Sequence, residues 1–104
     1  MNDREFCEHL EIEVKVLRIW VEQRWLMPRE AEAGWLFEEA DLARARLIQD
    51  LTGPMGVNDD GVDVAMRLLD QIHGLRGRLA VLMSAIRSQD PEVQRLILSR
   101  VEDE

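Results

Sequence analysis

The sequence predicts a mainly helical fold with at most one β-hairpin. Hydrophobic residues make up 46% of the 104 residues, and the leucines and alanines recur three and four positions apart, the period of a helix rather than of a strand. Extended backbone is indicated in one stretch alone, from Trp25 to Phe37. A chain of this length is large enough for one hydrophobic core, so we expect one domain.

The central segment is Gly34–Leu51, a short strand that leads directly into an amphipathic helix from about Glu38. Its apolar residues form two rows at helical spacing, Ala40, Ala43, Leu47 and Leu51 beside Leu42, Ala45 and Ile48. Together they make a broad apolar face, most of which should be buried. The helix should end before Thr52-Gly53-Pro54, which cannot continue it.

Two short helices are predicted ahead of this segment. Asn2 or Asp3 can cap a helix over residues 4–10, whose apolar side contains Phe6, Cys7 and Leu10. A second helix over residues 13–24 has a predicted core stripe of Val14, Leu17 and Val21, widened by Ile19 and Trp20. Two short helices joined by a tight turn indicate a helix-turn-helix.

A β-hairpin is predicted between the second helix and the central one. Pro28 disfavours helix at residues 25–30, and Gly34–Phe37 can return as the second strand after a turn at residues 31–33. Strand alternation puts Trp35 and Phe37 on one face, against the helices. We therefore expect a two-stranded wing, and expect all three tryptophans to lie mostly in the core.

A longer helix should follow the cap offered by Asn58, Asp59 and Asp60, with an inner face of Val62, Ala65, Leu69 and Ile72. Its later apolar residues are spaced 4-3-4-3-4, which is typical of a coiled coil. These six residues are called the seam: Leu68, Ile72, Leu75, Leu79, Leu82 and Ile86. Gly74 and Gly77 each weaken the helix by about 1 kcal/mol relative to Ala, so we expect a second copy to cover the seam. Parallel and antiparallel homodimers both fit this spacing.

Asp90-Pro91 can begin a last helix over residues 92–101, with Val93, Ile97 and Val101 on one side. The acidic end at residues 102–104 is expected to fray. The predicted organisation is therefore a head at residues 1–66, followed by a dimerisation helix and a C-terminal helix at residues 67–104.

The charge of the chain indicates the kind of partner it can bind. Thirteen basic residues face 21 acidic ones, a formal net charge of −8. This balance works against tight nonspecific binding to nucleic acid and favours a basic protein partner. The single cysteine fits a reducing compartment, and no apolar run approaches the roughly 20 residues of a membrane span. A cytoplasmic location is expected.

The sequence contains little that supports catalysis. Cys7, His9 and His73 are the only soft metal ligands, fewer than the four of a structural zinc site. No Gly-rich loop follows a strand, and Ser84, Ser88 and Ser99 lie on the helical tail without an activating turn. We expect no catalytic residue, cofactor or metal, and we expect Cys7 to be a small buried residue.

Two clusters of carboxylates lie at predicted helix starts. The first contains Glu38, Glu39 and Asp41, and the second contains Asp59, Asp60 and Asp63. They can cap the helices and complement the helix dipoles, or they can form part of a docking face for a basic helix. A DNA-binding surface would instead need several arginines of the head on one exposed helix and wing, and acidic residues are interleaved among them: Arg18, Arg24, Arg29, Arg44 and Arg46.

The order of elements resembles the winged helix-turn-helix head of the MerR group of regulators, with L-R-I-W-V-E-Q-R-W-L-M-P-R-E at the second helix and the start of the wing. The chain is most similar to the chaperone-modulator family CbpM, an offshoot of that group. The matching motifs are E-F-C-x-H at residues 5–9, P-R-E at 28–30, W-x-F at 35–37 and L-L-D-Q-I-H-G-L at 68–75. The resemblance covers about residues 4–86.

This resemblance implies a noncatalytic bacterial protein that binds the J-domain of the DnaJ-like co-chaperone CbpA. It further implies inhibition of CbpA's stimulation of the chaperone DnaK and of its DNA binding. J-domains present a basic helix, which an acidic domain can bind by complementary charge. The alternative is a MerR-like DNA-binding transcriptional regulator whose second helix enters the major groove. The apolar and acidic wing departs from that alternative, as does the lack of a cysteine set for metal sensing.

Overall fold

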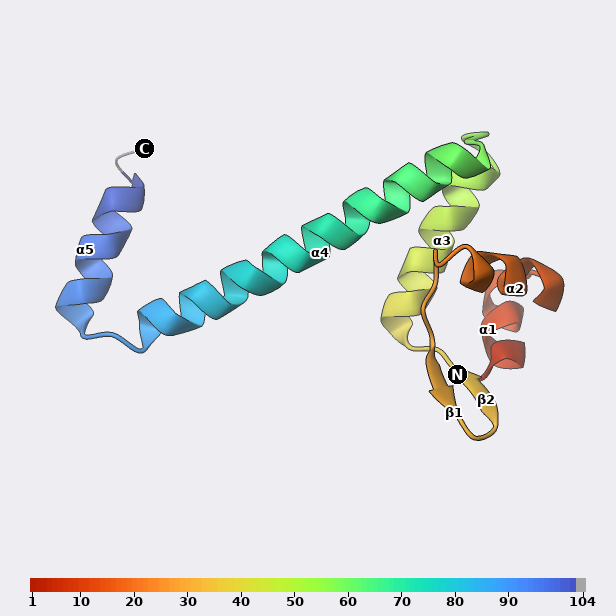
Figure 1. The fold of residues 1–104 in the computed structure, drawn as a ribbon, viewed down its shortest axis with the longest axis horizontal. Coiled ribbons are helices and arrows are strands. Elements are labelled where there is room, and N and C mark those ends of the chain that lie inside the picture. Colours follow the sequence, from red (N-terminus) through yellow and green to blue (C-terminus); the bar gives the residue numbers. More distant parts are fainter. Residues whose placement is uncertain (103–104) are drawn as a thin grey trace. The chain divides into compact units, whose positions relative to one another are not determined.

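The computed structural model describes residues 1–102 and divides the chain into two compact units. The N-terminal unit is Met1–Arg67 and the C-terminal unit is Leu68–Glu104. The described residues form five helices and one two-stranded antiparallel hairpin (Figure 1), so the predicted fold class is confirmed. The elements are α1 (Asp3–Leu10), α2 (Val14–Glu22), β1 (Arg29–Ala31), β2 (Gly34–Leu36), α3 (Glu39–Thr52), α4 (Asp59–Arg87) and α5 (Pro91–Glu102).

Helix α1 is fixed at both ends by its own backbone and side chains. The Asn2 side chain accepts a hydrogen bond from the Glu5 N–H at 2.9 Å, and the Glu5 carboxylate accepts one from the Asn2 N–H at 3.2 Å. This reciprocal pair is a capping box. The helix ends at Glu11 in the left-handed region, with φ of 55°, which turns the chain towards α2.

Helix α2 buries a narrower face than the sequence predicts. Leu17 and Trp20 are buried and Val21 is half-buried, but Val14 is 39% exposed and Ile19 is 49% exposed. The prediction was wrong for Val14 and Ile19, because a unit this small supplies neighbours for only one side of a nine-residue helix. The core is completed from the segment after α2, where Trp25 and Leu26 are buried.

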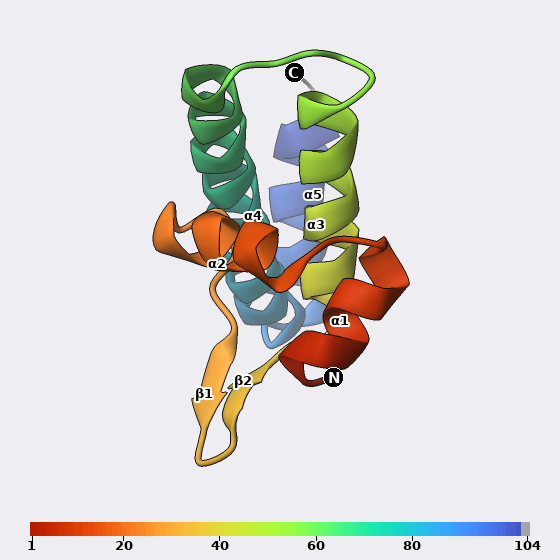
Figure 2. The ribbon, with the colours of Figure 1, turned by 90° about the vertical axis from the view of Figure 1, so that its right-hand side faces the viewer.

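The hairpin is attached to the helices through Phe37. Its register pairs Arg29 with Leu36, Glu30 with Trp35 and Ala31 with Gly34. Immediately after β2, the Phe37 ring stacks on Phe6 of α1 with the ring centroids 4.1 Å apart. The Trp35 ring meets Phe37 edge-on at 6.3 Å and is half-buried. Figure 2 shows the hairpin extending from the helices of the N-terminal unit, as expected for a wing.

Helix α3 connects the other elements of the N-terminal unit through two long side chains. Arg44 donates from Nε to the carbonyl of Trp25, and Gln49 donates from Nε2 to the carbonyl of Leu10 at 2.6 Å. These bonds tie α3 to the segment that follows α2 and to the last residue of α1. The row Leu42, Ala45 and Ile48 faces the core, whereas Ala40, Ala43 and Leu47 are exposed, so the predicted burial of most of the broad face was wrong.

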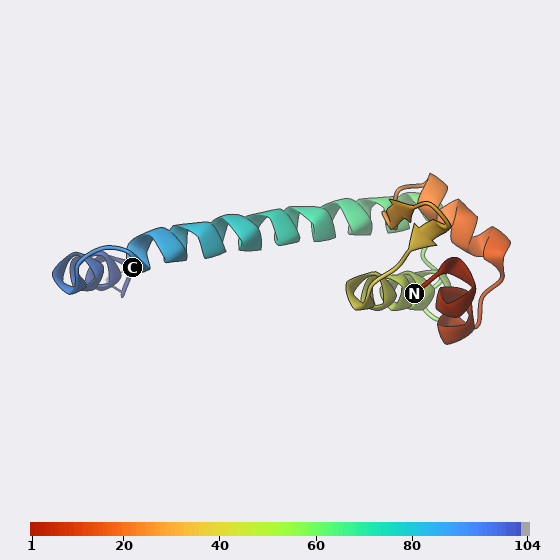
Figure 3. The same ribbon diagram turned by 90° about the horizontal axis from the view of Figure 1, so that it is seen from below.

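Helix α4 is preceded by Asn58, whose side chain accepts a hydrogen bond from the Gly61 N–H at 2.9 Å. Val62 and Met66 are buried, while Ile72, which was predicted to face inward, is 45% exposed. Met66, not Ile72, faces inward, because the core of the N-terminal unit ends within the first two turns of this helix. Gly74 and Gly77 do not interrupt α4, which Figure 3 shows as one unbroken helix.

In the C-terminal unit, α5 starts at the expected Asp90-Pro91 and includes Glu102. The rest of the acidic end that was expected to fray, residues 103–104, lies outside the described residues. The Gln94 side chain donates to the carbonyls of Gln89 at 2.8 Å and of Arg87 at 3.2 Å. It therefore fixes the turn that joins α4 to α5.

Candidate functional site

The first carboxylate cluster lies at the start of α3, where two of its three members hold the helix end. Glu38 is the N-cap residue, and its side chain accepts from the Asp41 N–H. Asp41 in turn accepts from the Glu38 N–H at 2.8 Å. Glu38 also lies 3.9 Å from the Arg29 guanidinium on β1. Glu39 is exposed in the same turn and makes no ion pair within residues 1–102.

The second cluster lies at the start of α4. Asp59 and Asp60 are exposed in its first turn, where the helix dipole favours negative charge. Asp63 accepts from the Arg67 guanidinium at 2.9 Å, one turn further along the helix. Because the capping bond at this end comes from Asn58, the carboxylates of Asp59 and Asp60 are left for solvent or a partner.

The two clusters do not form one continuous acidic face. They lie at opposite ends of α3, since α4 begins beside the last turn of α3 (Figure 2). Fourteen helical residues span about 20 Å, so each cluster would contact a different part of any bound partner.

The basic residues of the N-terminal unit are not gathered into one strip. Lys15 and Arg18 are exposed on α2, but Lys15 lies 3.4 Å from Glu13. On the wing, Arg29 is flanked by Glu30 and faces Glu38. Over residues 1–67, 15 acidic and eight basic side chains give a formal charge of −7. The corresponding count for residues 68–104 is six and five, or −1.

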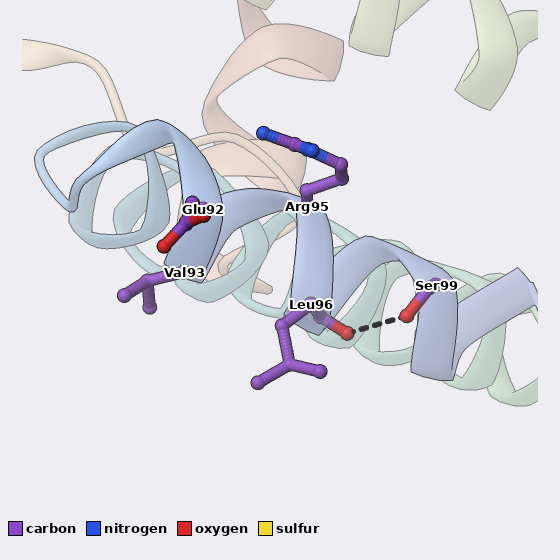
Figure 4. A pocket seen from close by; sticks show the side chains of 5 residues that line it. All are labelled: Glu92, Val93, Arg95, Leu96 and Ser99. Atoms are coloured by element: carbon purple, nitrogen blue, oxygen red, sulfur yellow. Dashed lines mark hydrogen bonds between the residues drawn. The ribbon is translucent and has the colours of Figure 1, made fainter.

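Cys7 and the surface hollows offer no reactive arrangement. Cys7 is buried, and burial, with a smaller effect of the nearby Asp3 charge, raises the pKa of its thiol. Within residues 1–102, no three His, Cys, Asp or Glu side chains are placed to hold a metal ion. The hollow in Figure 4 is lined by one helix, α5, and its Ser99 hydroxyl donates to the Leu96 carbonyl at 2.8 Å.

Comparison with known protein families identifies the family of this chain. The family described as MerR HTH family regulatory protein matches residues 1–84. The chain belongs to this MerR family. No curated protein and no solved structure matches it. In this MerR-family chain, the described helices include none long and apolar enough to cross a membrane.

The seam of this MerR-family chain is exposed along most of its length. Its first five residues, from Leu68 to Leu82, are each between 45% and 62% exposed, and Ile86 is half-buried. Arg76 and Arg78 flank it at the positions that follow Leu75 and precede Leu79. The sequence analysis did not single out these two arginines, although the heptad spacing alone places them beside the seam.

Proposed function

We propose that this MerR-family protein is a noncatalytic cytoplasmic modulator that binds the J-domain of a CbpA/DnaJ-type co-chaperone. Binding would inhibit the co-chaperone activity of that partner and its DNA binding. The observation that carries this proposal is the charge of −7 on residues 1–67. An anionic unit of this kind attracts a basic helix and repels a DNA backbone.

The carboxylates available to such a partner are those not already used in capping or ion pairs. Glu39 at the start of α3, and Asp59 and Asp60 at the start of α4, are exposed. None of the three forms an ion pair in the described part of the chain. Glu38, Asp41 and Asp63 would add to the negative potential around them while holding their helices. Each cluster would meet positive charge on a different part of the J-domain.

We further propose that the protein is a homodimer that pairs through the seam. Leu75 is 62% exposed and Leu79 is 57% exposed in the single chain. Such a row of leucines in water is stabilised by burial against a second copy. Two copies would present four acidic clusters to partner proteins.

A MerR-like DNA-binding transcriptional regulator is the second candidate function. The family match and the exposed Lys15 and Arg18 on α2 favour it, because a recognition helix uses such residues on phosphates and bases. Glu13 beside Lys15 and Glu22 one turn beyond Arg18 oppose it.

The test is a titration of the purified J-domain with the intact protein and with two charge variants. Replacing Asp59 and Asp60 by Asn should weaken binding about 5- to 30-fold, since partner-facing charges are worth about 1–2 kcal/mol together. The control replaces Glu8 on α1 and Glu22 on α2 by Gln, the same change in net charge at two exposed positions outside both carboxylate clusters. Equal effects of the two variants would contradict a local contact at α4, and absence of binding by the intact protein would contradict the proposed function.

A further inference from the structure

Helix α5 has an apolar strip that the described residues cover only in part, since Ile97 is half-buried and the other three members are exposed. The strip is defined here as Val93, Leu96, Ile97 and Val101, which share one side of the helix at spacings of three, four and one. Leu96 is 60% exposed and Val101 is 65% exposed. Figure 4 shows the Val93 and Leu96 side chains projecting to the same side of α5. The family match ends at residue 84, so it does not include this helix.

The turn before α5 is fixed by side-chain hydrogen bonds. Gln94 holds that turn by donating to the carbonyls of Arg87 and Gln89. The Ser88 hydroxyl adds a bond to the carbonyl of Ala85 at 2.6 Å. Three of the four residues of the strip, Val93, Leu96 and Val101, are exposed in the single chain.

We propose that the strip of α5 packs against a second copy of this chain and extends the interface formed by the seam. This inference rests on the proposed self-association of α4. It adds α5 to the interface between the two copies, which the seam alone does not imply. The contact of α5 with the other copy is called the clasp.

The area available supports a second copy as the occupant. At roughly 80 Å² of apolar surface for each side chain, the six residues of the seam provide about 500 Å² per copy. A stable interface buries about 800 Å² per partner. The four residues of the strip add about 300 Å² by the same measure, which brings the sum to the size of a stable interface.

Charge complementarity supports the same occupant. Residues 68–87, the part of α4 that bears the seam, contain Arg76, Arg78 and Arg87 and one carboxylate, Asp70, a formal charge of +2. Residues 90–104 contain five acidic and two basic side chains, a formal charge of −3. The segment around α5 of one copy is therefore opposite in charge to the part of α4 that bears the seam in the other copy.

The experiment measures the dimer dissociation constant of the full chain by analytical ultracentrifugation over a concentration series. Leu96→Glu should raise that constant at least 10-fold, because it places a charge in each of two symmetric contacts. The matched control is Leu98→Glu, which changes a 43%-exposed leucine about 200° around the same helix and should leave the constant within about 3-fold. Leu96→Ala provides a milder change, and circular dichroism verifies that each variant keeps its helix content.

The outcomes separate this inference from the self-association on which it rests. Leu75→Glu in the seam should produce a monomer. If the intact chain is monomeric, both the self-association and the clasp are wrong. If the intact chain is dimeric, Leu75→Glu dissociates it and Leu96→Glu has no more effect than Leu98→Glu, then only the clasp is wrong.

Discussion

At the scale of single residues, Glu11 occupies a conformation that suits glycine better. Its φ of 55° lies in the left-handed region, and its N–H bonds to the carbonyls of Cys7 and Glu8 to close α1. A side chain in this region costs about 1–2 kcal/mol. The helix-turn-helix is therefore formed with some backbone strain at its turn.

Glu11→Gly should raise the free energy of unfolding by about 0.5–1 kcal/mol, because the relief of strain exceeds the added entropy of the unfolded chain. Thermal unfolding followed by circular dichroism measures this change. Glu8→Gly, inside α1 and also exposed, is the control and should lower stability by about 1 kcal/mol. A loss of stability in both variants would contradict the strain at Glu11.

The glycines of α4 should respond in opposite directions to the same substitution. A Cβ at Gly61 would lie 2.6 Å from the Val57 Cγ1 atom, whereas a Cβ at Gly74 would meet nothing within 4 Å. Gly61→Ala should therefore destabilise the protein by about 1–3 kcal/mol through overpacking. Gly74→Ala should stabilise its helix by about 1 kcal/mol. Denaturant titration measures the free energy of unfolding of both variants. If both substitutions raise it, the contact with Val57 does not prevent a side chain at residue 61.

At the scale of elements, the wing depends on one aromatic contact. Phe37 is 2% exposed and stacks on Phe6. Its N–H donates a hydrogen bond to the Met1 carbonyl, and its carbonyl accepts one from the Met1 amino group. Since a two-stranded hairpin is marginal alone, this contact decides whether the wing is ordered.

Phe37→Ala should lower the free energy of unfolding by about 3–5 kcal/mol, the range for a buried aromatic side chain. Met27→Ala, at a 62%-exposed position in the segment leading to β1, should change it by no more than about 0.5 kcal/mol. Hydrogen exchange of the hairpin amides should accelerate in the first variant alone. Unchanged protection of the hairpin in Phe37→Ala would mean that other contacts hold the wing.

Periodicity predicted where the helices lie but not which side of each is buried. The bounds of α1, α3 and α5 agree with the sequence analysis within one residue at each end. The inward face of α2 was misjudged at Val14 and Ile19, since apolar residues surround that helix and only tertiary packing selects among them. The capping box at Glu38 was also unforeseen in detail, because Glu is an uncommon N-cap residue.

The sequence predicted which carboxylates form the candidate site but not how the two clusters are arranged in space. The carboxylates at the starts of α3 and α4 follow from the sequence, because acidic residues favour helix N-termini. Their separation by the length of α3 could not be read from spacing, since it depends on how α4 returns beside α3. The strip of α5 was visible in part as Val93, Ile97 and Val101, but the sequence did not indicate that most of it would be exposed in the single chain.

At the scale of the whole molecule, charge and apolar surface are distributed unequally along the chain. Residues 1–67 have a formal charge of −7, and residues 68–104 have a charge of −1 with a long exposed apolar row. Near-neutral, apolar surfaces favour association with a like copy, whereas strongly charged ones favour an oppositely charged partner. This distribution assigns self-association to the C-terminal unit and partner binding to the N-terminal unit in the proposed function.

The central claim, that the acidic unit binds a basic protein rather than DNA, is tested most directly by one pair of titrations. Fluorescently labelled intact protein is titrated with a purified J-domain and with duplex DNA at low and at moderate salt. The account predicts saturable J-domain binding that weakens at least 10-fold with salt, and no saturation by DNA at either salt. Saturable binding to the duplex together with no response to the J-domain would contradict it.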